Sequence, residues 1–208
     1  YGARARQQTP SWAPLPVQYA DYALWQRRVL GDENDPQSIV AQQVAHWTRA
    51  LSGIPDQLDL PTDRPRPATA SNHGATFTRS VDAVLQDALG QEARENNATL
   101  FMVVHTALST LLARLSGTTD IAIGTPVAGR GERALDDLVG MFVNTLVLRT
   151  DIDADATFTD LLEQTRRADI AAFGNADVPF ERLVEILDPA RSTARHPLFQ
   201  VMLTFQNL

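Results

Sequence analysis

Cysteine is missing from this 208-residue sequence, and its absence excludes several kinds of chemistry. Without cysteine there is no disulfide framework, no thiolate zinc site and no cysteine nucleophile. Long apolar runs are missing as well: none approaches the length of a membrane span, and no basic-then-apolar leader opens the chain. We therefore expect a soluble, cytoplasmic protein that works without a membrane. The chain opens on Tyr1 rather than Met, so it can be a piece of a longer protein.

An excess of positive charge is also missing. Lys and Arg number 18 against 25 Asp and Glu, which gives a formal net charge of −7. Nucleic acids and anionic membrane surfaces attract basic proteins through their phosphates. No run of like charge and no basic stripe offsets the negative balance, so we expect no nucleic-acid partner.

The sequence lacks the motifs of self-contained active sites. Its four histidines are scattered without an HExxH pattern, so we expect no metal site; they are His46, His73, His105 and His196. There is no GxSxG elbow, and the glycine-rich stretch 121–131 lacks the spacing and the Lys-Ser/Thr of a phosphate-binding loop. His105 lies on the most apolar predicted helix, where we expect a hydrogen-bonded core imidazole.

What the sequence does contain is a helical, proline-rich lead-in (1–73) followed by an α/β core (74–208). In the lead-in, helices are predicted over 15–31 and 35–53, and the four prolines of 54–74 indicate a linker or a long surface excursion. The core is predicted as a strand (74–82), two helices (83–97, 99–117), two strands (120–130, 141–150), two helices (158–175, 179–187) and a strand (198–206). Asp82, Thr99 and Thr157 are expected to cap helices. This order favours a sheet covered by helices.

One residue in the predicted strand 141–150 is out of place. Strand side chains alternate between faces, which puts Asn144 on the more apolar face with Phe142, Leu146 and Leu148. A buried carboxamide without partners costs roughly 1–3 kcal/mol. Two interpretations stay open: Asn144 anchors nearby backbone, or it lines a pocket and faces a polar substrate group.

The predicted strand 120–130 carries small residues on one face: Ala122, Gly124, Pro126 and Ala128. Such residues allow another backbone or a ligand to come close, and tight packing at a strand end is the favoured interpretation. Arg130 and Arg149 end the two predicted strands. Arginine suits bidentate pairing with a carboxylate, although exposed arginine is commoner.

Five stretches, taken in order, resemble the C-terminal half of condensation domains from nonribosomal peptide synthetases. They are YADYALWQ (19–26), LPTDRPRP (60–67), IGTPVAGR (123–130), MFVNTLVLR (141–149) and HPLFQVM (196–202). VPFERLVEILDP (178–189) is similar to the connecting helix of that family. The resemblance covers nearly the whole chain.

The resemblance implies a chloramphenicol-acetyltransferase-like fold of two pseudo-symmetric halves, of which residues 1–208 are the C-terminal subdomain. Such domains form an amide bond between donor and acceptor thioesters, each carried on the phosphopantetheine of a carrier protein, and bind no cofactor directly. The implied partners are the N-terminal subdomain, upstream and downstream peptidyl carrier proteins and an adjacent adenylation domain.

The family signature HHxxxDG lies in the N-terminal half, and no HH pair occurs in this sequence. We therefore expect no catalytic residue in this chain and no activity from it alone. The alternatives are a non-catalytic docking or recruiting module and an epimerising or cyclising relative; LPTDRPRP and the MFVN stretch favour ordinary condensation.

The resemblance also implies roles for individual residues. It places Asn144, Trp25, Gly124 and Pro126 at the substrate channel, and Arg130, Asp21 and Tyr22 in structural positions near it. Asn144 would orient substrate or hold the channel wall. Arg130 is expected to pair with a carboxylate in or near the channel.

Overall fold

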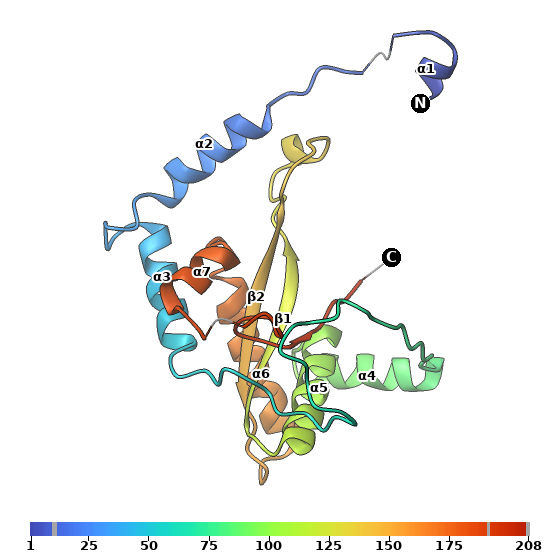
Figure 1. Ribbon diagram of the computed structural model, residues 1–208, viewed down its shortest axis with the longest axis vertical. Helices are drawn as coiled ribbons and strands as arrows, with labels where there is room; N and C mark the ends of the chain where they lie inside the picture. The colour runs from blue at the N-terminus through green and yellow to red at the C-terminus, as the bar shows by residue number, and fades with distance from the viewer. Residues whose placement is uncertain (10–11, 191, 207–208) are drawn as a thin grey trace.

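The computed structural model, which describes residues 1–9, 12–190 and 192–206, is built around a mixed three-stranded sheet (Figure 1). The central strand β1 (Asp120–Ala128) pairs antiparallel with β2 (Val143–Asp151) and parallel with the short β3 (Val201–Met202). Gly124 in β1 is opposite Val147 on one side and Met202 on the other. The predicted α/β class and mixed sheet are confirmed.

Helices pack around this sheet and extend away from it. In the described residues they are α1 (Gly2–Ala5), α2 (Tyr19–Leu30), α3 (Ile39–Ala50), α4 (Ala83–Glu95), α5 (Leu100–Ser116), α6 (Phe158–Phe173) and α7 (Phe180–Leu187). α5 packs against β1, α6 packs against β2, and the two helices pack against each other. The arrangement matches a sheet covered by helices.

The helix ends follow from local sequence. The hydroxyl oxygen of Thr99 accepts a hydrogen bond from the Met102 N–H at the start of α5, and Asp82 and Thr157 cap α4 and α6 in the same way. Gly117 ends α5 with φ +72°, a left-handed conformation that glycine adopts without strain. The three predicted caps are confirmed.

The core has two main clusters, and both include residues of the β1–β2 pair. The first joins Trp47 of α3 and Leu51, which follows α3 directly, to Leu146 and Leu148 of β2, all at most 2% exposed. The second surrounds Ile121 and Ile123 of β1 with side chains from α5 and α6. Because α3 belongs to the predicted lead-in (1–73), that segment contributes side chains to the same core as β2.

One strand prediction is wrong and another is confirmed only in part. Residues 74–82 form no strand among the described residues, and their apolar side chains are open to solvent, with Phe77 80% exposed. Their composition suits a strand, but a strand needs a neighbour for its backbone hydrogen bonds, and no such bond is present here. The predicted strand 198–206 is regular only over Val201–Met202, where it pairs with β1.

The proline-rich stretch 54–74 is a surface excursion that returns to the body of the protein. The Ala70 N–H donates to the Thr193 carbonyl at 3.1 Å, and the Thr193 hydroxyl donates to the Ala68 carbonyl at 2.9 Å. Nearer its start, the Leu58 N–H donates to the side chain of Gln200 at 2.8 Å. These bonds fasten an otherwise irregular segment to the chain that leads into and through β3.

The helix α2 extends away from the sheet toward the tip of the β1–β2 hairpin, as Figure 1 shows. None of its residues is buried. Tyr22 packs on Phe142 with ring centroids 5.1 Å apart, and Leu135 and Leu138 complete a small apolar cluster at the hairpin tip. A Cβ atom at Gly140 would overlap the Tyr19 ring, so the close approach of α2 requires glycine there.

No single helix in the described ranges is long and apolar enough to cross a membrane. Only α4 and α5 taken together meet that length and hydropathy, and they are bent by 102° at the break between them.

Candidate functional site

The side chain of Asn144 is an anchor for the loop that joins α6 to α7. Its Nδ2 donates to the carbonyls of Ala176 and Val178, both at 2.8 Å. Its Oδ1 accepts the N–H groups of Thr145 at 2.8 Å and Phe180 at 3.0 Å. A carboxamide has two N–H donors and two acceptor lone pairs, so every hydrogen-bonding position of Asn144 is occupied. The backbone-anchor interpretation is confirmed.

The same loop is held from its other side by α3. Trp47 Nε1 donates to the Asn175 carbonyl at 2.7 Å. Gln43, which is 6% exposed, accepts the Asp177 N–H at 3.0 Å and donates to Asp177 Oδ2 at 2.7 Å. The segment 175–180, here called the anchored loop, is therefore bonded to two elements that are distant in sequence.

Gln43 and Trp47 were not predicted as site residues. The sequence did carry a signal: Gln43 lies four residues before Trp47, on the same face of an amphipathic helix, where an amide is as unexpected as Asn144 in its strand. The partner of that amide is 134 residues away, so the sequence alone could not identify it.

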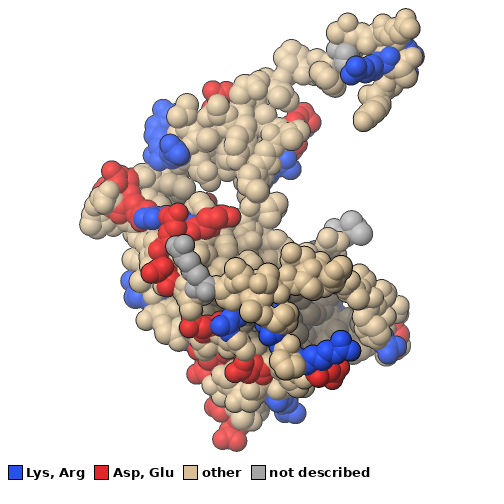
Figure 2. Space-filling view, viewed as in Figure 1, with Lys and Arg blue, Asp and Glu red and all other residues tan. Residues whose placement is uncertain are grey.

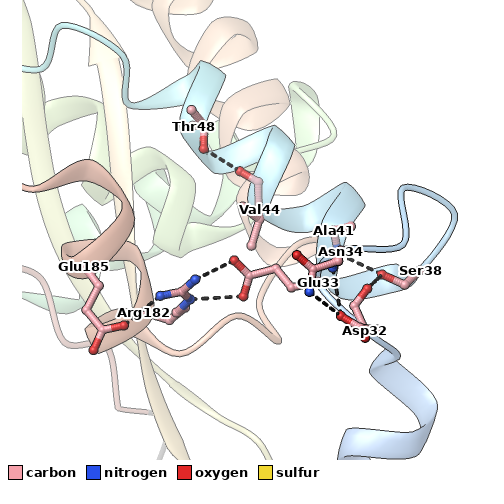
Figure 3. Close-up of polar contacts among 9 residues, drawn as sticks. All are labelled: Asp32, Glu33, Asn34, Ser38, Ala41, Val44, Thr48, Arg182 and Glu185. Atoms are coloured by element: carbon pink, nitrogen blue, oxygen red, sulfur yellow. Dashed lines mark hydrogen bonds and ion pairs between the residues drawn. The ribbon is translucent and has the colours of Figure 1, made fainter.

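A second contact holds the helix that follows the anchored loop. Arg182 in α7 makes two hydrogen bonds to Glu33, at 3.0 and 2.7 Å, and a third to Glu185 at 2.8 Å (Figure 3). The bonds to Arg182 hold the pKa of the Glu33 carboxyl below its ordinary value. The fork-shaped guanidinium thus ties α7 to the turn between α2 and α3.

A hollow of about 260 Å³ lies beside the anchored loop. Its lining includes Tyr19 and Gln26 of α2, Asn144 of β2, Asp177 of the loop and Glu181 of α7. The Tyr19 hydroxyl donates to the Met141 carbonyl at 2.9 Å, which holds this side of α2 against the hairpin. The hollow therefore brings together α2, the hairpin and the anchored loop, and its carboxylates favour a cationic or hydrogen-bond-donating group.

Tyr22 is next to this region and has a shifted pKa. Burial raises the pKa of its phenol, and the nearby Tyr19 and Asp177 add to that shift. Trp25, one turn further along α2, lies 6.1 Å from the Tyr22 ring and is 43% exposed. Asp21 accepts the Gln18 N–H at 2.9 Å and so caps α2. Asp21 and Tyr22 thus make structural contacts, and their position near a substrate channel stays a prediction.

Gly124 is required for packing. A Cβ atom there would overlap the ring of Phe199, so the absent side chain makes room for that aromatic ring. The favoured interpretation of tight packing is confirmed at this position. Pro126 is opposite Thr145 in the β1–β2 register, next to the strand position of Asn144.

The prediction that Arg130 pairs with a carboxylate is wrong: among the described residues Arg130 has no carboxylate partner. Arg130 Nη2 donates to the Leu138 carbonyl at 2.6 Å, and its guanidinium lies 4.5 Å from the centre of the Phe142 ring. The turn at the hairpin tip brings a carbonyl and an aromatic face within reach, and these satisfy the cation instead. Arg149, the arginine that ends the other strand, does bind a carboxylate, with two hydrogen bonds to Asp120.

His105 is a core imidazole, as predicted. It is fully buried, and its Nδ1 lies 3.0 Å from a carboxylate oxygen of Asp169, which is buried as well. No set of three or more His, Asp or Glu residues in the described part of the chain is arranged to hold a metal ion. The wall beside the hollow is therefore built largely from hydrogen-bonded backbone.

Comparison with known proteins gives a consistent result. The model of the condensation domain family matches residues 1–208. The chain is 54% identical over 207 residues to a dimodular nonribosomal peptide synthase of Bacillus subtilis and 51% identical over 207 residues to an isonitrile lipopeptide synthase of Mycobacterium tuberculosis. It spans all of its own length in both matches but only 9% and 8% of these relatives.

Solved structures show the same similarity. The X-domain from teicoplanin biosynthesis superimposes with a TM-score of 0.87 at 35% identity, covering 97% of this chain and 45% of the other. A four-domain nonribosomal peptide synthetase, holo-AB3403, gives a TM-score of 0.84 at 31% identity, covering 96% and 15%. In each case the matching protein extends well beyond the region that these 208 residues represent.

Proposed function

Because this chain belongs to the condensation domain family, as the C-terminal subdomain of its chloramphenicol-acetyltransferase-like fold, we propose that it is one half of an amide-forming site. In that site the amine of an acceptor aminoacyl thioester attacks the carbonyl carbon of a donor thioester. The new C–N bond forms, the phosphopantetheine thiol leaves, and the amine loses a proton. Both substrates would be tethered to carrier proteins, with no cofactor bound directly.

The observation that carries this proposal is the saturated carboxamide of Asn144 beside the hollow. All four of its hydrogen bonds go to backbone or loop groups, so it has no free donor for a substrate. Its role in the channel is then to hold the wall formed by the anchored loop. Trp25 and Pro126 would contribute to the same channel from α2 and β1, and Gly124 would set the packing behind it.

The proton of the attacking amine needs an acceptor of suitable pKa within hydrogen-bond reach. His105 cannot serve, because it is fully buried against Asp169. The base or amine-positioning group would come from the HHxxxDG signature of the N-terminal subdomain. This chain would supply orientation, which is the other main requirement of amide formation from a thioester.

Exposed apolar side chains support a partner subdomain at the α2 and hairpin end. Leu24 is 66% exposed on α2, and Val139 and Met141 are 94% and 74% exposed in the hairpin. Exposed apolar groups gathered in one region favour association. The proposed partners are the N-terminal subdomain, upstream and downstream carrier proteins and an adenylation domain, all in the cytoplasm. Blue and red residues are interspersed on the face in Figure 2, which does not favour a nucleic-acid or membrane partner.

The test is amide formation by the complete parent protein with substrate-loaded carrier proteins. We expect product from the complete protein and none from residues 1–208 alone. Turnover by this chain alone would require a base within it and would contradict the division of roles proposed above. No product from the complete, carrier-loaded protein would contradict the function itself.

A recruiting role is the second candidate. It is favoured by the similarity to the X-domain from teicoplanin biosynthesis, which has also been solved in a complex with OxyB. A parent protein that binds a partner enzyme without forming an amide would support this alternative, and the same carrier-loaded assay distinguishes the two.

A further inference from the structure

The anchored loop is bonded along both of its sides. Its even-numbered residues, Ala176, Val178 and Phe180, are bonded through their backbone to the carboxamide of Asn144. Its odd-numbered residues Asn175 and Asp177 are bonded to side chains of α3. Bonds to β2 and bonds to α3 therefore alternate along the loop, so that both elements hold it.

The contact from α3 to Asp177 depends on the chemistry of an amide. Gln43 presents an acceptor oxygen to the Asp177 N–H at 3.0 Å and a donor nitrogen to the Asp177 carboxylate at 2.7 Å. Neither a carboxylate nor an apolar side chain at position 43 can make both bonds. Gln43 is 6% exposed, so water cannot readily replace a lost partner.

The position of Asp177 matters for the hollow. Asp177 and Asn144 both line the hollow, and the charge of Asp177 contributes to the raised pKa of Tyr22. Because Gln43 binds both the backbone and the carboxylate of Asp177, it sets where the loop lies and the direction of that side chain. Asn144 alone fixes only the other side of the loop.

We infer that Gln43 is a positioning residue for the amide-forming site: it acts through Asp177 to hold the wall that Asn144 holds from the opposite side. This inference rests on the proposed function. It assigns Gln43 no contact with substrate. The prediction is that charge and hydrogen-bond complementarity between residues 43 and 177, rather than the identity of either one, is what the reaction requires.

The experiment is a swap of the amide and the carboxylate in the complete parent protein. Gln43→Glu places two carboxylates against each other and removes the donor. Adding Asp177→Asn to Gln43→Glu restores the pairing in reversed order, since the carboxylate now at position 43 would accept from both the side-chain amide and the backbone N–H of position 177. We expect Gln43→Glu to lower the rate of amide formation about tenfold and the double variant to recover to within about threefold of the unaltered protein.

Two further measurements separate positioning from general loss of structure. The defect of Gln43→Glu should shrink as the pH falls, because the introduced carboxyl group can again donate to Asp177 once it is protonated. Hydrogen exchange at the backbone amides of positions 177 and 180 should accelerate in the single variant and return to normal in the double variant. Gln42→Glu is the matched control, since Gln42 is the exposed neighbour in the same helix and should leave rate and exchange unchanged.

Each outcome decides the matter. Unchanged rate and exchange in Gln43→Glu would overturn the inference, as would a double variant no better than the single one. If Gln43→Glu does not fold, recovery of folding and rate in the double variant still supports the pairing, and failure of both variants overturns it. Absence of product from the unaltered protein would instead contradict the proposed function.

Discussion

Arg149 and Asp120 are joined across the β1–β2 pair by two hydrogen bonds, from Nε at 2.8 Å and from Nη2 at 2.7 Å. Ala122 is opposite Arg149 in the register, so Asp120 is its diagonal neighbour on the same face of the sheet. The third nitrogen of Arg149 donates to the carbonyls of Ala50 and Ser52 at the end of α3. One side chain thus connects both strands to the helix that holds the anchored loop.

Replacing Arg149 by lysine should therefore destabilise the protein although the charge is kept. Lysine cannot reproduce the bidentate fork and the two carbonyl contacts together, and we expect a loss of about 1–2 kcal/mol in the free energy of unfolding. Urea denaturation of Arg149→Lys and of the unaltered protein measures this loss in the free energy of unfolding. Arg167→Lys is the control, because that arginine is exposed and its ion pair with Glu163 contributes about 0.5 kcal/mol or less. Equal losses in both variants would contradict the assigned role.

Asn144→Ala should remove the hydrogen bonds that hold the anchored loop to β2. Two carbonyls and two N–H groups lose their partner, and with partial rehydration we expect a loss of about 2–4 kcal/mol. The measurement is chemical denaturation combined with hydrogen exchange over residues 175–180. Amide formation by the complete parent protein should fall as well. A variant that forms amide at the unaltered rate would contradict the role of Asn144 in the channel wall.

Much of this fold was predictable from the sequence because its signals are local. Each of the three capping residues directly precedes an apolar helical pattern: Asp82, Thr99 and Thr157. A helix cap is a hydrogen bond between residues three positions apart, so the local sequence is enough to predict it. The anomaly of Asn144 was equally visible, since alternation in a strand needs only the strand itself. These features depend on short-range geometry, which a single sequence contains.

The features that the sequence could not provide depend on distant partners. The strand expected over 74–82 is absent from the described residues because pairing requires a neighbouring strand, and composition cannot supply one. The partner of Gln43 is 134 residues away in the sequence. Arg130 contacts a backbone carbonyl and an aromatic ring, although a carboxylate partner was expected. Each case was decided by the packing of separate elements.

The Arg182–Glu33 contact gives a prediction for pH. The pKa of Glu33 is lowered in the folded protein, mainly by its hydrogen bonds to Arg182. A depressed carboxyl pKa stabilises the fold above the ordinary pKa of Glu, and that stability is lost as the pH falls through the lowered value. Both side chains are about two-fifths exposed, so we expect Glu33→Gln to cost less than about 1 kcal/mol near pH 7.

The difference between Glu33→Gln and the unaltered protein should shrink as the pH falls below about 4.3, the ordinary pKa of Glu, and disappear once Glu33 is protonated in the folded protein as well. Denaturation midpoints measured from neutral pH into the acid range test this. The control is Glu181→Gln, because Glu181 is exposed and makes no ion pair among the described contacts. If the difference in stability between Glu33→Gln and the unaltered protein grew as the pH fell, the lowered pKa of Glu33 would not be stabilising the fold as proposed.

The buried pair of His105 and Asp169 fixes how α6 lies against α5. Phe101 contacts Phe173 in the same helix pair, with ring centroids 6.0 Å apart. Moving four residues along α5, from 101 to 105, moves four residues back along α6, from 173 to 169, which defines an antiparallel register. The polar pair thus sits one helical turn from an aromatic pair, and Thr106, Ser109 and Thr165 are further buried polar residues of the two helices.

Removing one member of this pair should cost far more than removing both. His105→Leu leaves the Asp169 carboxylate buried without a partner, and we expect a loss of about 3–5 kcal/mol in the free energy of unfolding. The double variant His105→Leu/Asp169→Leu buries no charge and should recover most of that loss, because apolar replacements of buried pairs are often neutral or stabilising. His73→Leu, at an exposed histidine, should change nothing. Additive losses in the double variant would mean that the two side chains contribute separately, and that the register is set by apolar packing alone.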